Sequence, residues 1–136
     1  MATMKTEVHQ RPLGQLDSKH HLIASDRVEG TAVLNRDGVK IGTIERVMID
    51  KLSGQVQYAV LSSGGFLGIG ETYHPLPWSL LTYDPSQGGY VVDLDRSGLK
   101  SAPYYSGANE PNWADREWRQ SVGKHYRIDY PVQSVS

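Results

Sequence analysis

The sequence contains no cysteine in its 136 residues. Disulfide bonds, thiol nucleophiles and cysteine-ligated metal sites are therefore excluded, although this absence does not assign a cellular compartment. The chain also lacks a run of about 18 apolar residues, so no segment is expected to span a membrane as a helix. Residues 1–16 are polar and lack the apolar core of a secretory signal, which leads us to expect a cytoplasmic protein.

The chain also has no excess of charge of one sign, because it contains 14 basic and 15 acidic residues and its formal net charge is −1. The balance also holds within the N-terminal, central and C-terminal parts of the chain. No segment forms the basic stripe that binds phosphate backbones, so direct binding of RNA or DNA is not expected. The length is that of one modest domain with one core.

The residue types from which enzymes build active sites do not form a recognisable motif. No Gly-x-Ser-x-Gly sequence is present, and the glycine-rich segment lacks the Lys-Ser or Lys-Thr pair of a phosphate-binding loop. None of the five histidines has the helical spacing and nearby carboxylate of a hydrolytic zinc site. For His74, which lies in a predicted strand, a hydrogen-bonded structural role is favoured over a metal-ligand role. We therefore expect no catalytic residue, no metal and no cofactor.

A glycine-rich segment, residues 64–70, is the most informative feature that is present. Four glycines there alternate with large apolar residues between two strand-like runs, which is typical of a sharp turn in a small barrel. A tight connection between strands is the simplest interpretation, and an apolar loop that contacts a second subunit or a partner is the alternative. The residues with a predicted structural role are Gly64, Gly65, Gly68 and Gly70. The residues with predicted partner contacts are Phe66, Leu67 and Ile69.

Five short runs of mostly alternating apolar residues, joined by turns rich in Asn, Asp, Ser and Gly, indicate β-strands. The second run is interpreted as a strand with a bulge near Gly42, although its spacing also fits a helix. Trp78 is expected on the fourth strand as a structural residue of the core or its rim, and Pro75 and Pro77 restrict that strand to an edge or to its frayed end. The predicted fold class is mainly β, a small and strongly bent antiparallel barrel followed by short helical segments. The runs are residues 31–34, 39–49, 56–62, 75–81 and 90–94.

Aromatic residues are concentrated behind the predicted barrel, in a segment with little apolar mass of its own. A helix is predicted there from about Asn112 to Gly123, after a shorter helical turn at residues 96–102. The aromatic side chains must pack on a surface, which is the barrel of the same chain, a second subunit or another partner. We predict partner contacts by Trp113 and Trp118. The full set is Tyr104, Tyr105, Trp113, Trp118, Tyr126 and Tyr130.

Several pieces in a fixed order resemble the PRC-barrel family, named for the cytoplasmic domain of the H subunit of photosynthetic reaction centres and for related ribosome-maturation factors. The resemblance covers residues 22–103. It implies a flexible tail at residues 1–21, a PRC-barrel domain at 22–103, and an aromatic-rich extension with a short helix at 104–136. The pieces are residues 22–30, 35–38 followed by 41–42, 49–50 leading to 53–54, 58–61, the glycine-rich segment and 77–79.

The resemblance implies structural and adaptor roles, because the family has no common catalytic motif to transfer. We therefore expect a non-enzymatic module that forms a homodimer and acts as a protein-interaction or scaffold domain. The reaction-centre branch implies peripheral association with a membrane electron-transfer complex. A role in ribosome maturation, suggested by the other branch, and a small-ligand carrier with a pocket under the glycine-rich segment and Trp78 are the alternatives.

Overall fold

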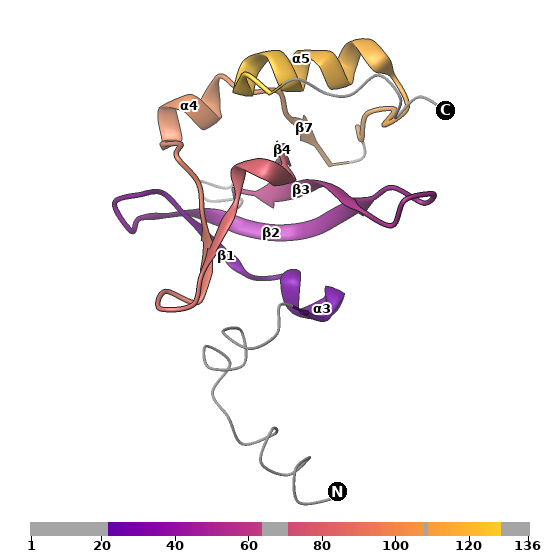
Figure 1. The fold of residues 1–136 in the computed structure, drawn as a ribbon. Coiled ribbons are helices and arrows are strands. Elements are labelled where there is room, and N and C mark those ends of the chain that lie inside the picture. The colour runs from indigo at the N-terminus through magenta and orange to yellow at the C-terminus, as the bar shows by residue number, and fades with distance from the viewer. Residues whose placement is uncertain (1–21, 64–70, 108, 129–136) are drawn as a thin grey trace, which may run out of the picture.

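Seven strands form a single sheet in the computed structural model of the protein, which describes residues 22–63, 71–107 and 109–128 (Figure 1). The strand order is β5-β6-β1-β2-β3-β4-β7. The predicted tail at residues 1–21 and the glycine-rich segment at 64–70 lie outside the described residues. The strands are β1 (Ala32–Leu34), β2 (Lys40–Ile49), β3 (Val56–Ser62), β4 (Thr72–Pro77), β5 (Thr82–Asp84), β6 (Gly89–Val91) and β7 (Tyr105–Ser106). The helices are α3 (Ser25–Val28), the 3-10 helix η2 (Trp78–Leu80), α4 (Arg96–Lys100) and α5 (Arg116–Tyr126).

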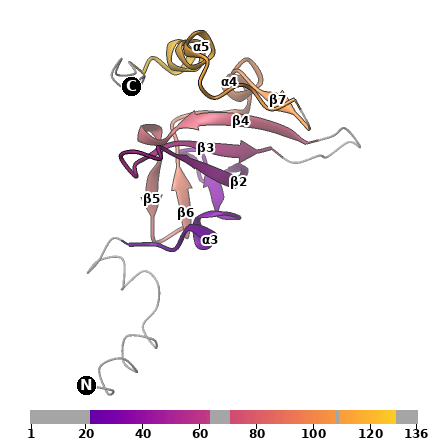
Figure 2. The same cartoon turned by 90° about the vertical axis from the view of Figure 1, so that its right-hand side faces the viewer.

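The mainly β fold class is confirmed, with two differences from a closed antiparallel barrel. The β5–β6 hairpin stands at a steep angle to β3 and β4, so the sheet is strongly bent (Figure 2). Its edge strands β5 and β7 do not pair with each other, so the sheet stays open within the described residues. The pairing of β1 with β6 is parallel, and a long stretch of chain separates the two strands, as parallel pairing requires.

Bulges bend β2, and the predicted bulge near Gly42 is confirmed. The pairing of β1 with β2 skips Ile41, and the pairing of β2 with β3 shifts again just after Ile44. A bulge inserts one residue and therefore reverses the face that the following side chains meet. For this reason Ile41, Ile44 and Val47, spaced three residues apart, all pack on the core, although one regular strand would direct them to both faces.

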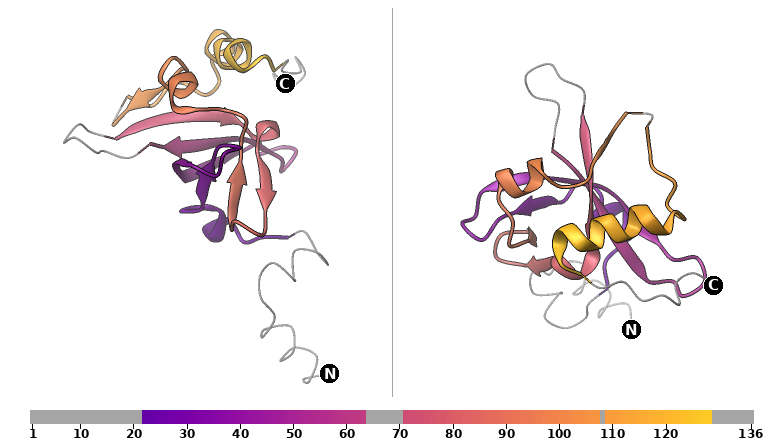
Figure 3. Two further views of the ribbon diagram at one scale, coloured as in Figure 1. Left: turned by 90° about the vertical axis from the view of Figure 1, so that its left-hand side faces the viewer. Right: turned by 90° about the horizontal axis from the view of Figure 1, so that it is seen from above.

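The central strand β3 is buried on both of its faces. Ala59 and Leu61 face the interior of the bent sheet, whereas Tyr58 and Val60 face the C-terminal extension, and all four are at most 4% exposed. Helix α5 covers this outer face by packing on β4 (Figures 1 and 3). The interior core combines side chains from the strands, α3 and α4, namely Val28, Val33, Ile41, Ile44, Ala59, Leu61, Leu76, Tyr90, Val92 and Leu99.

Trp78 lies in η2, so its predicted place on a strand is wrong. Strand β4 ends at Pro77, and the chain turns directly into the 3-10 helix. The ring of Trp78 is half-buried and contacts Tyr90, with 5.3 Å between the ring centroids, which places it at the rim of the core as expected. The edge position of the two prolines is confirmed, because β7 pairs only with Thr72 and Tyr73 and leaves the rest of β4 without a strand on its outer side in the described sheet.

Helix α5 begins and ends later than predicted. Its cap is Asp115, whose carboxylate accepts a hydrogen bond from the backbone N–H of Glu117 at 3.0 Å, so the predicted start near Asn112 is wrong. The helix continues through the buried Gly123 and ends at Arg127, which adopts the left-handed conformation with φ 60°. The shorter helix α4 is confirmed, with Asp95 as its cap.

Leu22 and Ile23 lie at the start of the described residues and are exposed. Their side chains are 80% and 46% exposed, and the buried residue of α3 is Val28. Within the described residues, no helix combines the length and the apolar character needed to cross a membrane.

Candidate functional site

An aromatic cluster, defined as Tyr58, Tyr105, Trp113 and Trp118, joins the C-terminal extension to the outer face of β3. The ring centroids of Trp113 and Trp118 lie 5.6 and 6.5 Å from that of Tyr58, and 5.3 Å from each other. Trp113 also meets Tyr105 edge to face at 6.3 Å. The structure therefore brings Trp113 and Trp118, both predicted contact residues, together on the barrel of the same chain, where both rings are half-buried. Their role in contacting a partner stays a prediction.

The other predicted contact residues, Phe66, Leu67 and Ile69, lie outside the described residues, as do Gly64, Gly65, Gly68 and Gly70. The structural and partner-binding roles assigned to this segment therefore stay predictions.

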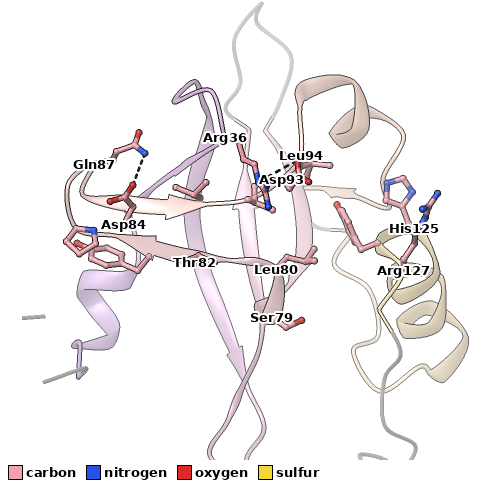
Figure 4. Close-up of a pocket in the computed structure, with 15 residues that line it drawn as sticks. Arg36, Ser79, Leu80, Thr82, Asp84, Gln87, Asp93, Leu94, His125 and Arg127 are labelled. Atoms are coloured by element: carbon pink, nitrogen blue, oxygen red, sulfur yellow. Dashed lines mark hydrogen bonds and ion pairs between the residues drawn. The ribbon is translucent and has the colours of Figure 1, made fainter. Parts of the chain in front are cut away.

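A groove of about 860 Å³ lies between the β5–β6 hairpin and the end of α5 (Figure 4). Its lining contains charged groups of both signs. Arg36 and Asp93 stand 3.9 Å apart at one side, and His125 and Arg127 project from the end of α5. Asp84 accepts a hydrogen bond from the Gln87 side chain at 2.9 Å, and this bond, followed by those from Ser86, holds the pKa of Asp84 below its usual value.

The groove runs beside an edge of the sheet. Strand β5 is the first strand in the sheet order, and no described strand pairs with its outer side. Thr82 is exposed on this strand, and Thr82 and Asp84 both line the groove. An edge strand next to a groove offers backbone hydrogen-bonding groups and side-chain pockets to the same binding partner.

A second cavity, of about 350 Å³, lies where β3 ends and β4 begins. Ser63 and Thr72, which stand on either side of residues 64–70, line it together with His74 and two basic residues of α4. Trp78, which was expected to line a ligand pocket, is not among the residues that line this cavity.

His74 is the most unusual residue of this cavity. Its side chain is only 5% exposed, and Nδ1 is buried without a hydrogen-bond partner among the described residues, so the expected hydrogen bond is missing at this atom. Burial lowers the pKa of His74 from 6.5 to about 4, which keeps the ring neutral at physiological pH. Within the described ranges, no group of three or more metal-ligating side chains comes together.

The low pKa of His74 predicts a loss of stability in mild acid. The unfolded chain takes up a proton near the usual pKa of 6.5, whereas the folded protein does so only at about 4, so the unfolded state binds more protons between these values. As the pH falls through this window, the free energy of unfolding should decrease by about 2 kcal/mol at about pH 4.5.

Urea unfolding of the protein and of His74→Leu, at neutral pH and at about pH 4.5, measures this loss. The carboxylates are common to both proteins, so their titration cancels in the comparison, and the variant should lose about 2 kcal/mol less. An equal loss in both proteins contradicts a buried neutral His74.

Sequence reasoning missed the residues that surround His74. The i, i+4 spacing of Arg96 and Lys100 can be read from the sequence. The sequence does not indicate, however, which strand the predicted helical turn at residues 96–102 would face. The residues of the β5 groove come from four separate parts of the chain and have no common sequence pattern.

Comparison with known proteins assigns the fold. The sequence profile of the family described as PRC-barrel domain matches residues 20–99, which is more than half of the chain. The chain belongs to the PRC-barrel family. This confirms the resemblance detected in the sequence.

No curated protein matches this PRC-barrel chain. Among solved structures, a protein from Pseudomonas aeruginosa described as a 16S ribosomal RNA processing protein, RimM, is similar, with 20% sequence identity and a TM-score of 0.38. The match covers 59% of this chain and 48% of that chain, so the PRC-barrel chain spans about half the length of that protein. The processing role named for that protein is not transferred to this chain.

Proposed function

We propose that this PRC-barrel chain is a non-catalytic protein-binding module that holds an extended segment of a partner protein in the groove along β5. The observation that carries the proposal is the edge position of β5 beside the groove. The family resemblance, which implies adaptor roles, supports the same class of function.

The backbone of β5 supplies the first part of the interaction. A partner segment in the extended conformation pairs with Thr82–Asp84 and continues the sheet, as in other cases of strand addition. Three residues form few hydrogen bonds, so this pairing alone gives a weak and reversible complex.

The side chains of the groove supply the second part. Leu80 and Val91 offer apolar contacts, while Arg127 and Asp84 offer charges of opposite sign. A partner segment with alternating apolar and charged residues fits this lining, because alternate side chains of a strand point to opposite faces. The charges select the partner and its orientation more than they add affinity.

Site-specific photo-crosslinking in the native cells tests the proposal. A photoreactive phenylalanine derivative replaces Thr82 in one variant and Lys51, an exposed residue of the β2–β3 turn, in the control. We expect the Thr82 variant to give about tenfold more of one crosslinked product, attached within an extended segment of the partner.

Three outcomes of this experiment are informative. A product between two copies of the chain identifies the partner as a second subunit and supports the predicted homodimer. Equal products from both positions, or a partner attached only at position 51, contradict binding along β5. The predicted peripheral association with a membrane complex is tested by the identity of the attached protein.

A further inference from the structure

The second cavity shares no lining residue with the groove along β5, and its chemistry is different. We propose that this cavity, between β4 and α4, binds a small neutral aromatic molecule that carries a hydroxyl group. The aromatic ring packs on the apolar walls, and the hydroxyl group forms a hydrogen bond with the buried imidazole of His74. The site is separate from the surface proposed to bind a partner segment.

His74 indicates that the ligand carries a hydrogen-bonding group. Its side chain is 5% exposed, and Nδ1 is buried without a hydrogen-bond partner among the described residues. Such an atom is unusual, because nearly all buried polar groups in proteins are paired. His74 lines the cavity, so a polar group of a bound molecule provides the partner that the described protein atoms do not.

Polar side chains that line the same cavity bond other groups. Ser63 Oγ donates a hydrogen bond to the backbone oxygen of Thr72 at 3.4 Å. The guanidinium of Arg96 donates to the backbone oxygen of Lys40 at 3.4 Å and takes part in a further interaction. These side chains therefore form part of the wall, and the described residues leave Nδ1 of His74 to a ligand.

The electrostatics of the cavity favour a neutral molecule. Burial lowers the pKa of His74 to about 4, so the ring is uncharged at neutral pH and attracts no ion. Arg96 and Lys100 line the cavity and repel a cation, whereas a neutral ligand needs no free cation to be recognised. In a neutral imidazole one nitrogen donates a hydrogen bond and the other accepts one. A hydroxyl group does both and therefore bonds Nδ1 in either tautomer.

The remaining walls favour an aromatic body. Ile41 and Leu99, which belong to the core and are 3% and 4% exposed, line the cavity. Tyr104 lines it as well and stays 59% exposed, with its ring centroid 6.0 Å from that of His74. An aromatic ring gains from contact with these apolar side chains and from a tilted contact with the exposed ring of Tyr104. A volume of about 350 Å³ is at the lower end of known ligand sites and suits a molecule of on the order of ten non-hydrogen atoms.

NMR titration of the ¹⁵N-labelled protein tests the proposal with phenol and toluene as probes. Both molecules have one aromatic ring and the same number of non-hydrogen atoms, and phenol is uncharged at neutral pH. Toluene transfers more readily from water to an apolar surface, so apolar walls alone favour toluene. We expect phenol to bind at least about fivefold more tightly, because only phenol forms the hydrogen bond with His74.

The positions of the shifted signals give a second readout. The backbone signals of Ile41 and Leu99 should shift with both probes, because both probes enter the cavity. The ¹⁵N signal of His74 Nδ1 should shift much more with phenol than with toluene, since a hydrogen bond changes the electron density at that nitrogen. A His74 with a purely structural role would respond equally to the two probes.

A variant of His74 separates the hydrogen bond from the apolar walls. His74→Leu removes the ring nitrogens and keeps an apolar side chain, so the preference for phenol should be lost. The matched control, Gln120→Leu, makes a polar-to-apolar change at an exposed residue of α5 outside the cavity and should keep that preference. The backbone spectrum of each variant shows that it is folded.

Four results would overturn the proposal. They are equal or tighter binding of toluene, a preference for phenol that persists in His74→Leu, shifts located away from the cavity, and the absence of any saturable shift with phenol up to about 5 mM. None of them affects the outcome of the crosslinking at β5.

Discussion

Val122→Asp is expected to lower the free energy of unfolding by more than about 3 kcal/mol. Val122 is completely buried on α5, the helix that packs on β4. A carboxylate at this fully buried position loses its hydration, which the side chain at an exposed position keeps. The control is Ser121→Asp, which adds the same charge to an exposed position of the same helix and should change stability by less than about 0.5 kcal/mol.

Urea unfolding followed by tryptophan fluorescence measures both variants, since Trp118 lies on the same helix. Measurement at several protein concentrations also shows whether the C-terminal extension covers the barrel of its own chain or that of a second chain. Packing within one chain makes stability independent of concentration, whereas exchange of the extension between two chains makes it rise with concentration. Equal stability of Val122→Asp and Ser121→Asp contradicts the docking of α5 on the sheet.

Gly42→Ala is expected to destabilise the protein by about 3 kcal/mol. A methyl group at Gly42 meets the backbone oxygen of Ser62 at 2.6 Å and the side chain of Leu61 at 2.7 Å. The backbone of β3 cannot move away without disturbing its pairing with β2, so the strain is not relieved by a side-chain rotation.

Gly98→Ala is the matched control, because its added methyl group meets the terminal Cδ1 of Leu94 at 2.8 Å. That atom is the far end of a flexible side chain, and alanine is the better helix former, so a change within about 1 kcal/mol is expected. Thermal unfolding of both variants decides the comparison. A Gly42→Ala protein as stable as the control means that β2 and β3 are less closely packed around Gly42 than the structure describes.

The predictions that the structure confirmed were based on residues close together in the sequence. The glycine in the second run indicated the bulge near Gly42, because glycine permits unusual backbone conformations. The two prolines of the fourth run indicated an edge strand, because proline has no N–H to donate to a neighbouring strand. The boundaries of α5 were harder to predict, since Asn112 and Asp115 are both good helix caps. The structure uses both side chains, Asn112 to bond the backbone N–H of Ala114 and Asp115 to begin the helix.

The candidate site was predicted only in part, because its residues are distant in the sequence. The basic pair of α4 and the neutral His74 are far apart in the sequence and line one cavity only because the chain turns back after β6. The aromatic extension was expected to need a surface, and its composition alone did not decide between its own barrel, a second subunit and another partner.

The family, the mainly β class and most of the strands could be read from the amino-acid sequence, because apolar alternation, turn residues and ordered motifs are properties of short segments. The folded chain was needed to establish that β1 and β6 run parallel, that β3 is covered on both faces, and that His74 and two basic residues line one cavity. These features depend on contacts between segments far apart in the chain, whose pairing is chosen by the total burial of apolar surface rather than by any local preference.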